Sequence, residues 1–230
     1  MARLSIIVPV LDEAANIVAL QALAPLRARG AEIIVVDGGS ADDTAALAAP
    51  FADRVLASAR GRATQMNAGA ASARGDVLLF LHADTRLPAD AERLILEGLA
   101  QSRRAWGRFD VTIEGGHPLF PIIAWFMNTR SRLTGIATGD QAMFVRRDAF
   151  AAAGGFPEIA LMEDIAFARR LKRVSRPVCL RARVITSGRR WEKRGVLRTI
   201  LLMWRLRLAY YLGADPTKLA RAYGYAPVQN

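Results

Sequence analysis

The stretch IIVVDGGSADDT at residues 33–44 decides the fold of this chain. Four β-branched apolar residues run into an acid, two glycines and a Ser/Asp cluster, which is typical of a buried strand that ends in a polar turn. The stretch VLLFLHADT at residues 77–85 repeats this pattern and places Asp84 after its apolar run. Because ligands of open parallel sheets bind beyond the carboxyl ends of the strands, we expect Asp37 and Asp84 to meet there. The alternative is that such acids only cap helices.

Strand and helix patterns alternate through the first half of the chain. The predicted strands are residues 4–8, 33–36, 54–56 and 77–81, and the predicted helices are 12–29, 42–49, 62–73 and 88–100. This alternation predicts an α/β fold with a mostly parallel, Rossmann-like central sheet and helices on both of its faces.

The second half is less regular. Strands are expected at 106–113 and 142–146, and helices at 148–153 and 162–173. Residues 196–212 are apolar but carry three Arg, which makes this segment too short and too charged to span a bilayer well. The pattern predicts a domain at 1–190 and a helical extension at 191–230 that packs on the domain or lies at a membrane surface.

Composition narrows the class of protein. The 230 residues suit one domain, and the net charge of +11 suggests nucleic acid, anionic lipid or phosphorylated ligands as partners. Of the 32 basic residues 29 are Arg, and aromatic residues are not interleaved with them, so no nucleic-acid partner is expected. The single Cys179 excludes an intramolecular disulfide, and a strand close to Met1 leaves no room for a signal peptide. We expect a cytoplasmic protein, with the inner face of the membrane as a more specific alternative.

Several residue types suit the binding of a nucleoside diphosphate. The carboxylates of Glu13 and Asp37 accept hydrogen bonds from nucleoside imide and hydroxyl groups, and Gly38 allows close backbone approach. Arg62, at the start of a predicted helix, suits a phosphate. Asp84 is the expected ligand of a divalent cation, either Mg²⁺ or Mn²⁺, bound across the diphosphate.

Five sequence pieces in order resemble those of the family 2 glycosyltransferases, which have the GT-A fold. They are residues 5–13, 35–44, 61–69, 82–85 and the signature from Gly139 through Gly154-Gly155-Phe156 to Asp164. The resemblance covers roughly residues 4–198. This chain departs from the family's Asp-x-Asp metal motif because His82 stands at the first position. Imidazole can bind Mn²⁺ but suits Mg²⁺ poorly, and the alternative role for His82 is contact with the ribose or a phosphate.

The resemblance implies roles for particular residues. Asp164 is the general base that accepts the proton of an acceptor hydroxyl, with Glu163 and Asp140 as further catalytic candidates. A single base without a covalent intermediate implies inversion at the anomeric carbon. The resemblance also implies a UDP- or GDP-sugar as the donor and a hydroxyl group as the acceptor. A lipid-linked acceptor is one option. The residues expected to bind the nucleotide sugar are Pro9, Glu13, Asp37, Gly38, Ser40, Arg62, Asn67, His82, Ala83 and Arg190, with Asp84 on the metal.

Three other readings stay open from the sequence. A sugar-phosphate nucleotidyltransferase would need a basic, Gly-rich loop after the first strand, where residues 10–15 instead read VLDEAA. A basic nucleic-acid-binding protein explains the charge but not the acids at the strand ends. A non-catalytic family member is conceivable because of His82. The preferred reading expects Asp37, Asp84 and Asp164 to surround one cavity.

Overall fold

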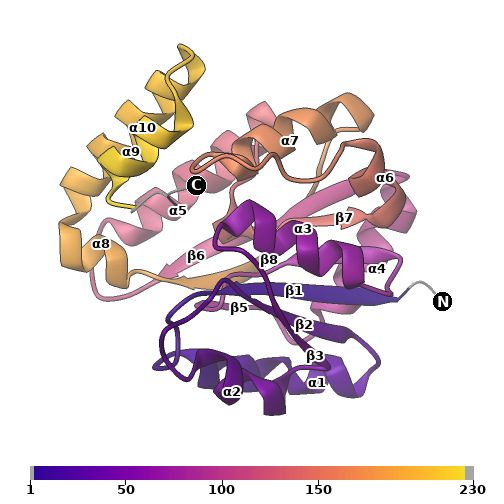
Figure 1. Ribbon diagram of the computed structural model, residues 1–230. Helices are drawn as coiled ribbons and strands as arrows, with labels where there is room; N and C mark the ends of the chain where they lie inside the picture. The colour runs from indigo at the N-terminus through magenta and orange to yellow at the C-terminus, as the bar shows by residue number, and fades with distance from the viewer. Residues whose placement is uncertain (1–2, 226–230) are drawn as a thin grey trace.

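The computed structural model describes residues 3–225 and shows a central eight-stranded sheet flanked by helices (Figure 1). The strand order is β3-β2-β1-β4-β7-β6-β8-β5. The strands are β1 Leu4–Val10, β2 Glu32–Asp37, β3 Arg54–Ala57, β4 Val77–Phe80, β5 Thr85–Arg86, β6 Trp106–Glu114, β7 Phe144–Arg146 and β8 Val178–Ser187.

The first half of the sheet is parallel, as the alternating pattern predicts. β1 lies between β2 and β4, and β3 extends the sheet beyond β2, with parallel pairing throughout. Every residue of β2 and β4 is buried, because helices cover both faces of this part of the sheet. The carboxyl ends of these strands therefore share one edge of the sheet.

The second half of the sheet is mixed. β7 is antiparallel to both β4 and β6, β6 is parallel to β8, and β5 is antiparallel to β8. Four of the seven neighbouring pairs are thus parallel, so the expected mostly parallel sheet holds only roughly. The strands β5 and β8 have no counterpart among the predicted elements.

The helices form layers on the two faces of the sheet (Figure 1). One core joins η1, α1, α4 and part of α5 to the sheet, and the other joins α3, α6, α7, α9 and α10 to the opposite face. The helices are η1 Ile17–Leu23, α1 Ala24–Ala28, α2 Thr44–Ala48, η2 Ala49–Phe51, α3 Arg62–Ser72, α4 Ala91–Ser102, α5 Phe120–Thr134, η3 Gly139–Gln141, α6 Arg147–Ala152, α7 Glu163–Val174, α8 Arg189–Arg194, α9 Val196–Tyr211 and α10 Pro216–Tyr223.

Two local predictions near the N-terminus are wrong. The expected helix 12–29 is a 3₁₀ helix followed by the short α1, because Pro25 lies in the first turn of α1 and residues 12–14 bond to the loop after β2 instead. The first strand also continues through Pro9 to Val10. The pairing of β1 with β4 ends at Ile7, so the missing N–H of Pro9 costs no bond to that strand.

The C-terminal helices α8, α9 and α10 follow β8 and contact one another. Val196, Thr199 and Leu206 form the buried face of α9, and Leu219 and Ala220 anchor α10. No helix within residues 3–225 has both the length and the hydrophobicity needed to cross a bilayer. The division at residue 190 into a domain and an extension stays a prediction, and residues 226–230 of that extension lie outside the described part.

Candidate active site

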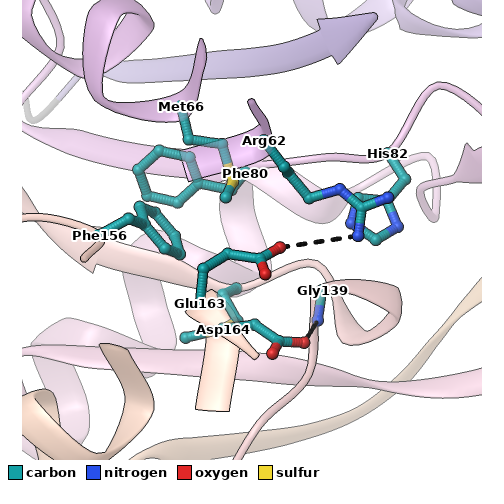
Figure 2. Close-up of a pocket in the computed structure, with 9 residues that line it drawn as sticks. Arg62, Met66, Phe80, His82, Gly139, Phe156, Glu163 and Asp164 are labelled. Atoms are coloured by element: carbon teal, nitrogen blue, oxygen red, sulfur yellow. Dashed lines mark hydrogen bonds and ion pairs between the residues drawn. The ribbon is translucent and has the colours of Figure 1, made fainter. Parts of the chain in front are cut away.

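A small pocket opens beyond the end of β4, where the first residues of α3 and α7 approach the sheet (Figure 2). Its lining combines four apolar side chains with charged and polar groups. The residues that line it are Arg62, Met66, Phe80, His82, Gly139, Met143, Phe156, Glu163 and Asp164. Four of the predicted site residues, Arg62, His82, Glu163 and Asp164, are therefore brought together from three separate parts of the chain.

Glu163 and Arg62 form an ion pair inside this pocket, with 3.7 Å between Oε1 and Nη1 (Figure 2). Glu163 is almost fully buried, at 5% exposure. Burial and the charge of the adjacent Asp164 raise the pKa of the Glu163 carboxyl, whereas Arg62 opposes that rise. The surroundings of Glu163 therefore disfavour its ionised form.

Asp164 is held by backbone groups. Its Oδ2 accepts a hydrogen bond from the N–H of Gly139 at 2.9 Å (Figure 2). Its Oδ1 accepts one from the N–H of Ile165 at 2.6 Å. A carboxylate oxygen has two lone-pair directions, so each oxygen can still accept a further proton donor. The orientation of this carboxylate is thus fixed while each of its oxygens can accept another hydrogen bond.

His82 and Asp140 face each other across the loop that carries Gly139. The His82 Nδ1 lies 3.4 Å from the Asp140 Oδ1. A Cβ on Gly139 would meet the His82 Nε2 at 2.4 Å, so the ring packs directly on the glycine backbone. Burial opposes ionisation of Asp140, but the hydrogen bond and charge of His82, with Arg62 and Arg207, lower the pKa of this carboxyl. The surroundings of Asp140 therefore favour its ionised form, which faces the His82 ring.

The C-terminal segment reaches the same rim. The Arg62 Nη2 donates to the Tyr225 hydroxyl at 3.4 Å, and the Arg190 Nη1 donates to the hydroxyls of Tyr223 and Tyr225 at 2.8 and 3.1 Å. Burial opposes the charge of Arg62, but Tyr225, Glu163 and the two aspartates nearby raise its pKa. The contact of Arg190 with the nucleotide sugar stays a prediction. In this structure the Arg190 guanidinium binds the hydroxyls of Tyr223 and Tyr225.

The predicted nucleotide-binding loop after β2 is organised by Asp37. This carboxylate accepts hydrogen bonds from the N–H groups of Gly39 and Ser40 and from the Ser40 hydroxyl. A Cβ on Gly38 would meet the Gln65 side chain at 2.9 Å. Gln65 donates to the carbonyls of Val10 and Val36 at 2.7 and 2.8 Å, and so ties the ends of β1 and β2 together.

Two other predicted residues have clear partners. The Glu13 Oε2 accepts a hydrogen bond from Asn16 at 2.7 Å, next to Pro9 and Val10 at the end of β1. Asn67 exchanges two hydrogen bonds of 2.9 Å with the backbone of Phe156, so it fixes the Gly154-Gly155-Phe156 turn. Those bonds favour a structural role for Asn67 over the predicted contact with a nucleotide.

The pocket does not include Asp37 or Asp84. Of the three aspartates expected to surround one cavity, only Asp164 lines it. The predicted residue Ala83 is buried between His82 and Asp84 and does not line the pocket. The predicted site residues thus fall into two groups. One group lies in the loops after β1 and β2, and the other lines the pocket beyond β4. The predicted roles of all these residues stay predictions.

The family model for glycosyl transferase family 2 matches residues 5–153, about two thirds of the chain. This chain belongs to that family. No curated protein sequence matches the chain. Membership of this family favours the preferred reading over the alternatives of a nucleotidyltransferase and of a nucleic-acid-binding protein.

Solved structures of glycosyltransferases share the GT-A fold of this family 2 member at low sequence identity. S. aureus TarS 1-349 has 18% identity and a TM-score of 0.67, over 81% of this chain and 60% of that one. Mannosyltransferase PcManGT from Pyrobaculum calidifontis, in complex with GDP-Man and Mn²⁺, has 20% identity and a TM-score of 0.63, over 97% and 69%. Glucosyl-3-phosphoglycerate synthase from Mycobacterium tuberculosis, in complex with Mn²⁺, UDP-glucose and phosphoglyceric acid, has 17% identity and a TM-score of 0.59, over 79% and 70%. The chain thus spans about 60% of the length of the TarS fragment.

The residues present fit a divalent metal only if the donor supplies part of its coordination. Among residues 3–225 no cluster of three or more His, Cys, Asp or Glu could hold a metal ion. Asp84 has one long contact, 3.4 Å from the Thr85 hydroxyl to its Oδ1, and the imidazole of His82 is directed to Asp140. Mg²⁺ and its relatives are commonly bound by one or two carboxylates with substrate phosphates and waters, which suits this arrangement.

Some residues of the site were not anticipated. Gln65 and Met66 lie within the family-like piece at residues 61–69, but α3 also carries other polar residues, so no local signal distinguished Gln65. The apolar lining residues Phe80 and Met143 had no signal as site residues, because buried apolar residues are normal in any core. Phe156 belongs to the family-like signature, but its place in the pocket was not predicted.

Proposed function

We propose that this chain is an inverting glycosyltransferase that moves a sugar from a UDP- or GDP-sugar to a hydroxyl acceptor in one displacement. The acceptor oxygen attacks the anomeric carbon, the bond from that carbon to the diphosphate oxygen breaks, and the acceptor proton passes to Asp164. The observation that supports this best is the Asp164 carboxylate, fixed by Gly139 beside the Arg62–Glu163 pair in a family 2 fold.

We assign the binding of the nucleotide-sugar donor to residues beyond the carboxyl ends of β1 and β2 and to the start of α3. TarS has been solved with UDP-GlcNAc and PcManGT with GDP-Man, which supports a nucleotide-sugar donor here. We assign the nucleoside to Glu13 and Asp37, and the negative charge that grows on the leaving diphosphate to Arg62. A cation already placed where charge develops lowers the barrier without reorganisation.

We assign Asp84 as the carboxylate ligand of Mg²⁺ or Mn²⁺. When bound, such an ion neutralises charge on the leaving diphosphate as a Lewis acid. Because this chain offers so few ligands, we expect the metal to bind weakly alone and tightly only with the nucleotide.

Calorimetric binding of UDP-, GDP- and dTDP-sugars with and without Mn²⁺ tests the donor assignment. Asp84→Ala is expected to abolish the metal-dependent part of nucleotide binding. Asp43→Ala is the matched control, because Asp43 is an exposed acid in the loop after β2 and its side chain makes no capping bond to α2. Absence of binding by every nucleotide sugar, or equal loss in both variants, would contradict the proposal. Donor binding with no transfer to any acceptor would identify a non-catalytic member.

A second observation favours contact with a membrane surface. Leu197, Leu201, Trp204 and Leu208 are spaced three or four residues apart on α9 and are each more than 60% exposed. They form one apolar stripe, and the exposed Arg198 and Arg205 lie along its edge. We propose that this stripe lies on an anionic bilayer, to which basic residues beside an apolar helix face are attracted.

Sedimentation with vesicles of phosphatidylcholine and phosphatidylglycerol tests this contact. The double variant Trp204→Glu, Leu208→Glu is expected to stay in the supernatant, whereas Leu47→Glu, an exposed leucine on α2, is expected to sediment like the wild type. No sedimentation of the wild type would end this part of the proposal without affecting the donor assignment.

A further inference from the structure

The hydroxyl of Tyr225 joins two arginines that come from different helices. The Arg62 Nη2, at the start of α3, donates to this oxygen at 3.4 Å, and the Arg190 Nη1, in the first turn of α8, donates to it at 3.1 Å. Because both nitrogens lie within hydrogen-bonding distance of one oxygen atom, the two guanidinium groups are neighbours in space. Arg62 also lines the pocket beyond β4, so Arg190 lies close to the rim of that pocket.

Packing among the C-terminal helices fixes the position of this hydroxyl. The Tyr225 N–H donates to the carbonyl of Ala220, a fully buried residue of α10, at 2.9 Å. The rings of Tyr223 and Tyr225 pack edge to face at 5.0 Å, and the Arg190 guanidinium lies over both of them, 5.5 and 5.7 Å from the ring centroids. The Arg194 Nη1 donates to the Tyr223 carbonyl at 2.7 Å. These contacts attach the end of α10 to α8 without using the Tyr225 hydroxyl.

Helix α8 also reaches the loop after β1. The Arg189 Nη1 donates to the Asn16 Oδ1 at 2.6 Å, and the Asn16 Nδ2 in turn donates to the Glu13 Oε2 at 2.7 Å. Glu13 is the residue that we assign to the nucleoside, and Arg62 is the one that we assign to the diphosphate. Helix α8 therefore connects the two ends of the proposed donor site, and its Arg190 lies next to the diphosphate end.

The chemistry of these groups suits a diphosphate. A tyrosine hydroxyl accepts two hydrogen bonds and donates one, and the Tyr225 hydroxyl accepts from both arginines. Each guanidinium presents five N–H donors in a planar fork, so most of them stay available to phosphate oxygens. Two neighbouring cations repel each other, and a doubly charged anion between them removes that repulsion. Because the hydroxyl holds the two cations in place before the anion arrives, less freedom is lost on binding.

We propose that Tyr225 is a positioning residue that holds Arg62 and Arg190 together as one binding site for the diphosphate of the donor. This inference rests on the proposed function, in which Arg62 faces the leaving diphosphate. Tyr223 assists with one of the two arginines, because its hydroxyl accepts from Arg190 at 2.8 Å. Tyr225 lies beyond the sequence pieces that resemble the family, and it acts on the donor through the two arginines.

Calorimetry with inorganic pyrophosphate and Mg²⁺ tests this role, since pyrophosphate carries the diphosphate without a sugar or a nucleoside. We expect the wild type to bind pyrophosphate, and Tyr225→Phe to weaken that affinity roughly fivefold, which is the effect of about one hydrogen bond. Arg62→Gln and Arg190→Gln are each expected to weaken it by roughly tenfold or more, because each removes a charged donor. Tyr211→Phe removes the hydroxyl of an exposed tyrosine on α9 and is expected to bind like the wild type.

A double-mutant cycle distinguishes positioning from a merely structural role. If Tyr225 acts by linking the two arginines, Tyr225→Phe causes a clearly smaller loss of pyrophosphate affinity in the Arg190→Gln background than in the wild type. An undiminished loss in that background would overturn the inference.

A comparison of UDP with uridine, or of GDP with guanosine if the wild type prefers GDP, gives a second readout. Tyr225→Phe is expected to weaken the diphosphate roughly fivefold and to leave the affinity for the nucleoside unchanged, because the nucleoside has no phosphate for the arginines. An equal loss for both ligands would show a general distortion of the site and would also overturn the inference.

The outcomes separate this inference from the proposed function. Equal or higher pyrophosphate affinity in Tyr225→Phe overturns the inference, and so does a wild type that binds no pyrophosphate. Binding of nucleotide sugars by the wild type leaves the proposed donor site standing in either case. If the wild type binds no nucleotide sugar but binds pyrophosphate through Tyr225 and the two arginines, the proposed function fails and the anion site stands.

Discussion

The N–H of Gly139 donates to the Asp164 carboxylate at 2.9 Å, although 25 residues separate them in the chain. This bond joins the short η3 helix to the first turn of α7. His82 packs on the other side of Gly139, and its Nδ1 faces Asp140. One glycine therefore sets the position of the proposed base relative to the loop and the histidine around it.

Gly139→Ala is expected to lower activity strongly while the protein stays folded. The new Cβ would lie 2.4 Å from the His82 Nε2, so either the ring or the loop must move and the Asp164 carboxylate loses its orientation. We expect a fall in kcat of roughly a hundredfold, because small misplacements of catalytic groups have effects of that size. The matched control is Gly116→Ala, where a Cβ would have no neighbour within 4 Å and where activity is expected to be unchanged.

Asp164→Asn is expected to remove transfer and spare donor binding. The amide oxygen can still accept one backbone hydrogen bond, but it is too weak a base to take the acceptor proton. Loss of a general base typically lowers the rate by about 10²–10⁴-fold. Steady-state turnover and calorimetric binding of the donor check the two halves of the prediction. Full turnover by this variant would show that another group is the base.

Glu163→Gln is expected to stabilise the protein at neutral pH but not in acid. Burial and Asp164 raise the folded-state pKa of Glu163 above 4.5, so the wild type loses stability as the pH rises from 4.5 through that raised value. The neutral amide avoids this loss. Urea unfolding at several pH values should show a gap between variant and wild type that opens with increasing pH, and no such gap for the exposed Glu158→Gln.

Glu32→Gln is expected to destabilise the fold by about 2 kcal/mol at neutral pH. The buried Glu32 accepts from the Ser5 hydroxyl at 2.6 Å, the Arg74 N–H at 2.8 Å and the Arg54 Nη2 at 2.5 Å. Burial opposes its charge, but these bonds lower its pKa below 4.5. The stabilisation is therefore present above pH 4.5 and is lost as the pH falls through the lowered folded-state pKa. Urea unfolding of this variant, with the exposed Glu97→Gln as the control, measures it.

The parallel half of the sheet could be predicted because its strands are buried on both faces. Such strands are short apolar runs bounded by turns, and residues 33–36 and 77–81 have this form. The strand β8 could not be found in the same way. Most of its residues are only partly buried and it includes Arg181 and Arg183, so neither an apolar run nor a clean alternation marks it.

The candidate site was predictable by residue type more than by position. Arg62, Glu163 and Asp164 could be named because their motifs occur in a fixed order, and the structure brings them into one pocket. Asn67 was named for the same reason, yet its amide is taken by the backbone of Phe156, 89 residues away. A motif gives the residue, but its hydrogen-bond partners depend on which loop packs against it.

The sequence by itself determined the family, the α/β alternation and the acids available for chemistry, since strand burial, turn residues and motif order are local properties of the chain. Only the tertiary structure decided which of those acids share a pocket and where the exposed stripe of α9 lies. Hydrogen bonds, ion pairs and burial depend on contacts between segments far apart in the chain, and no local pattern of residues records such contacts.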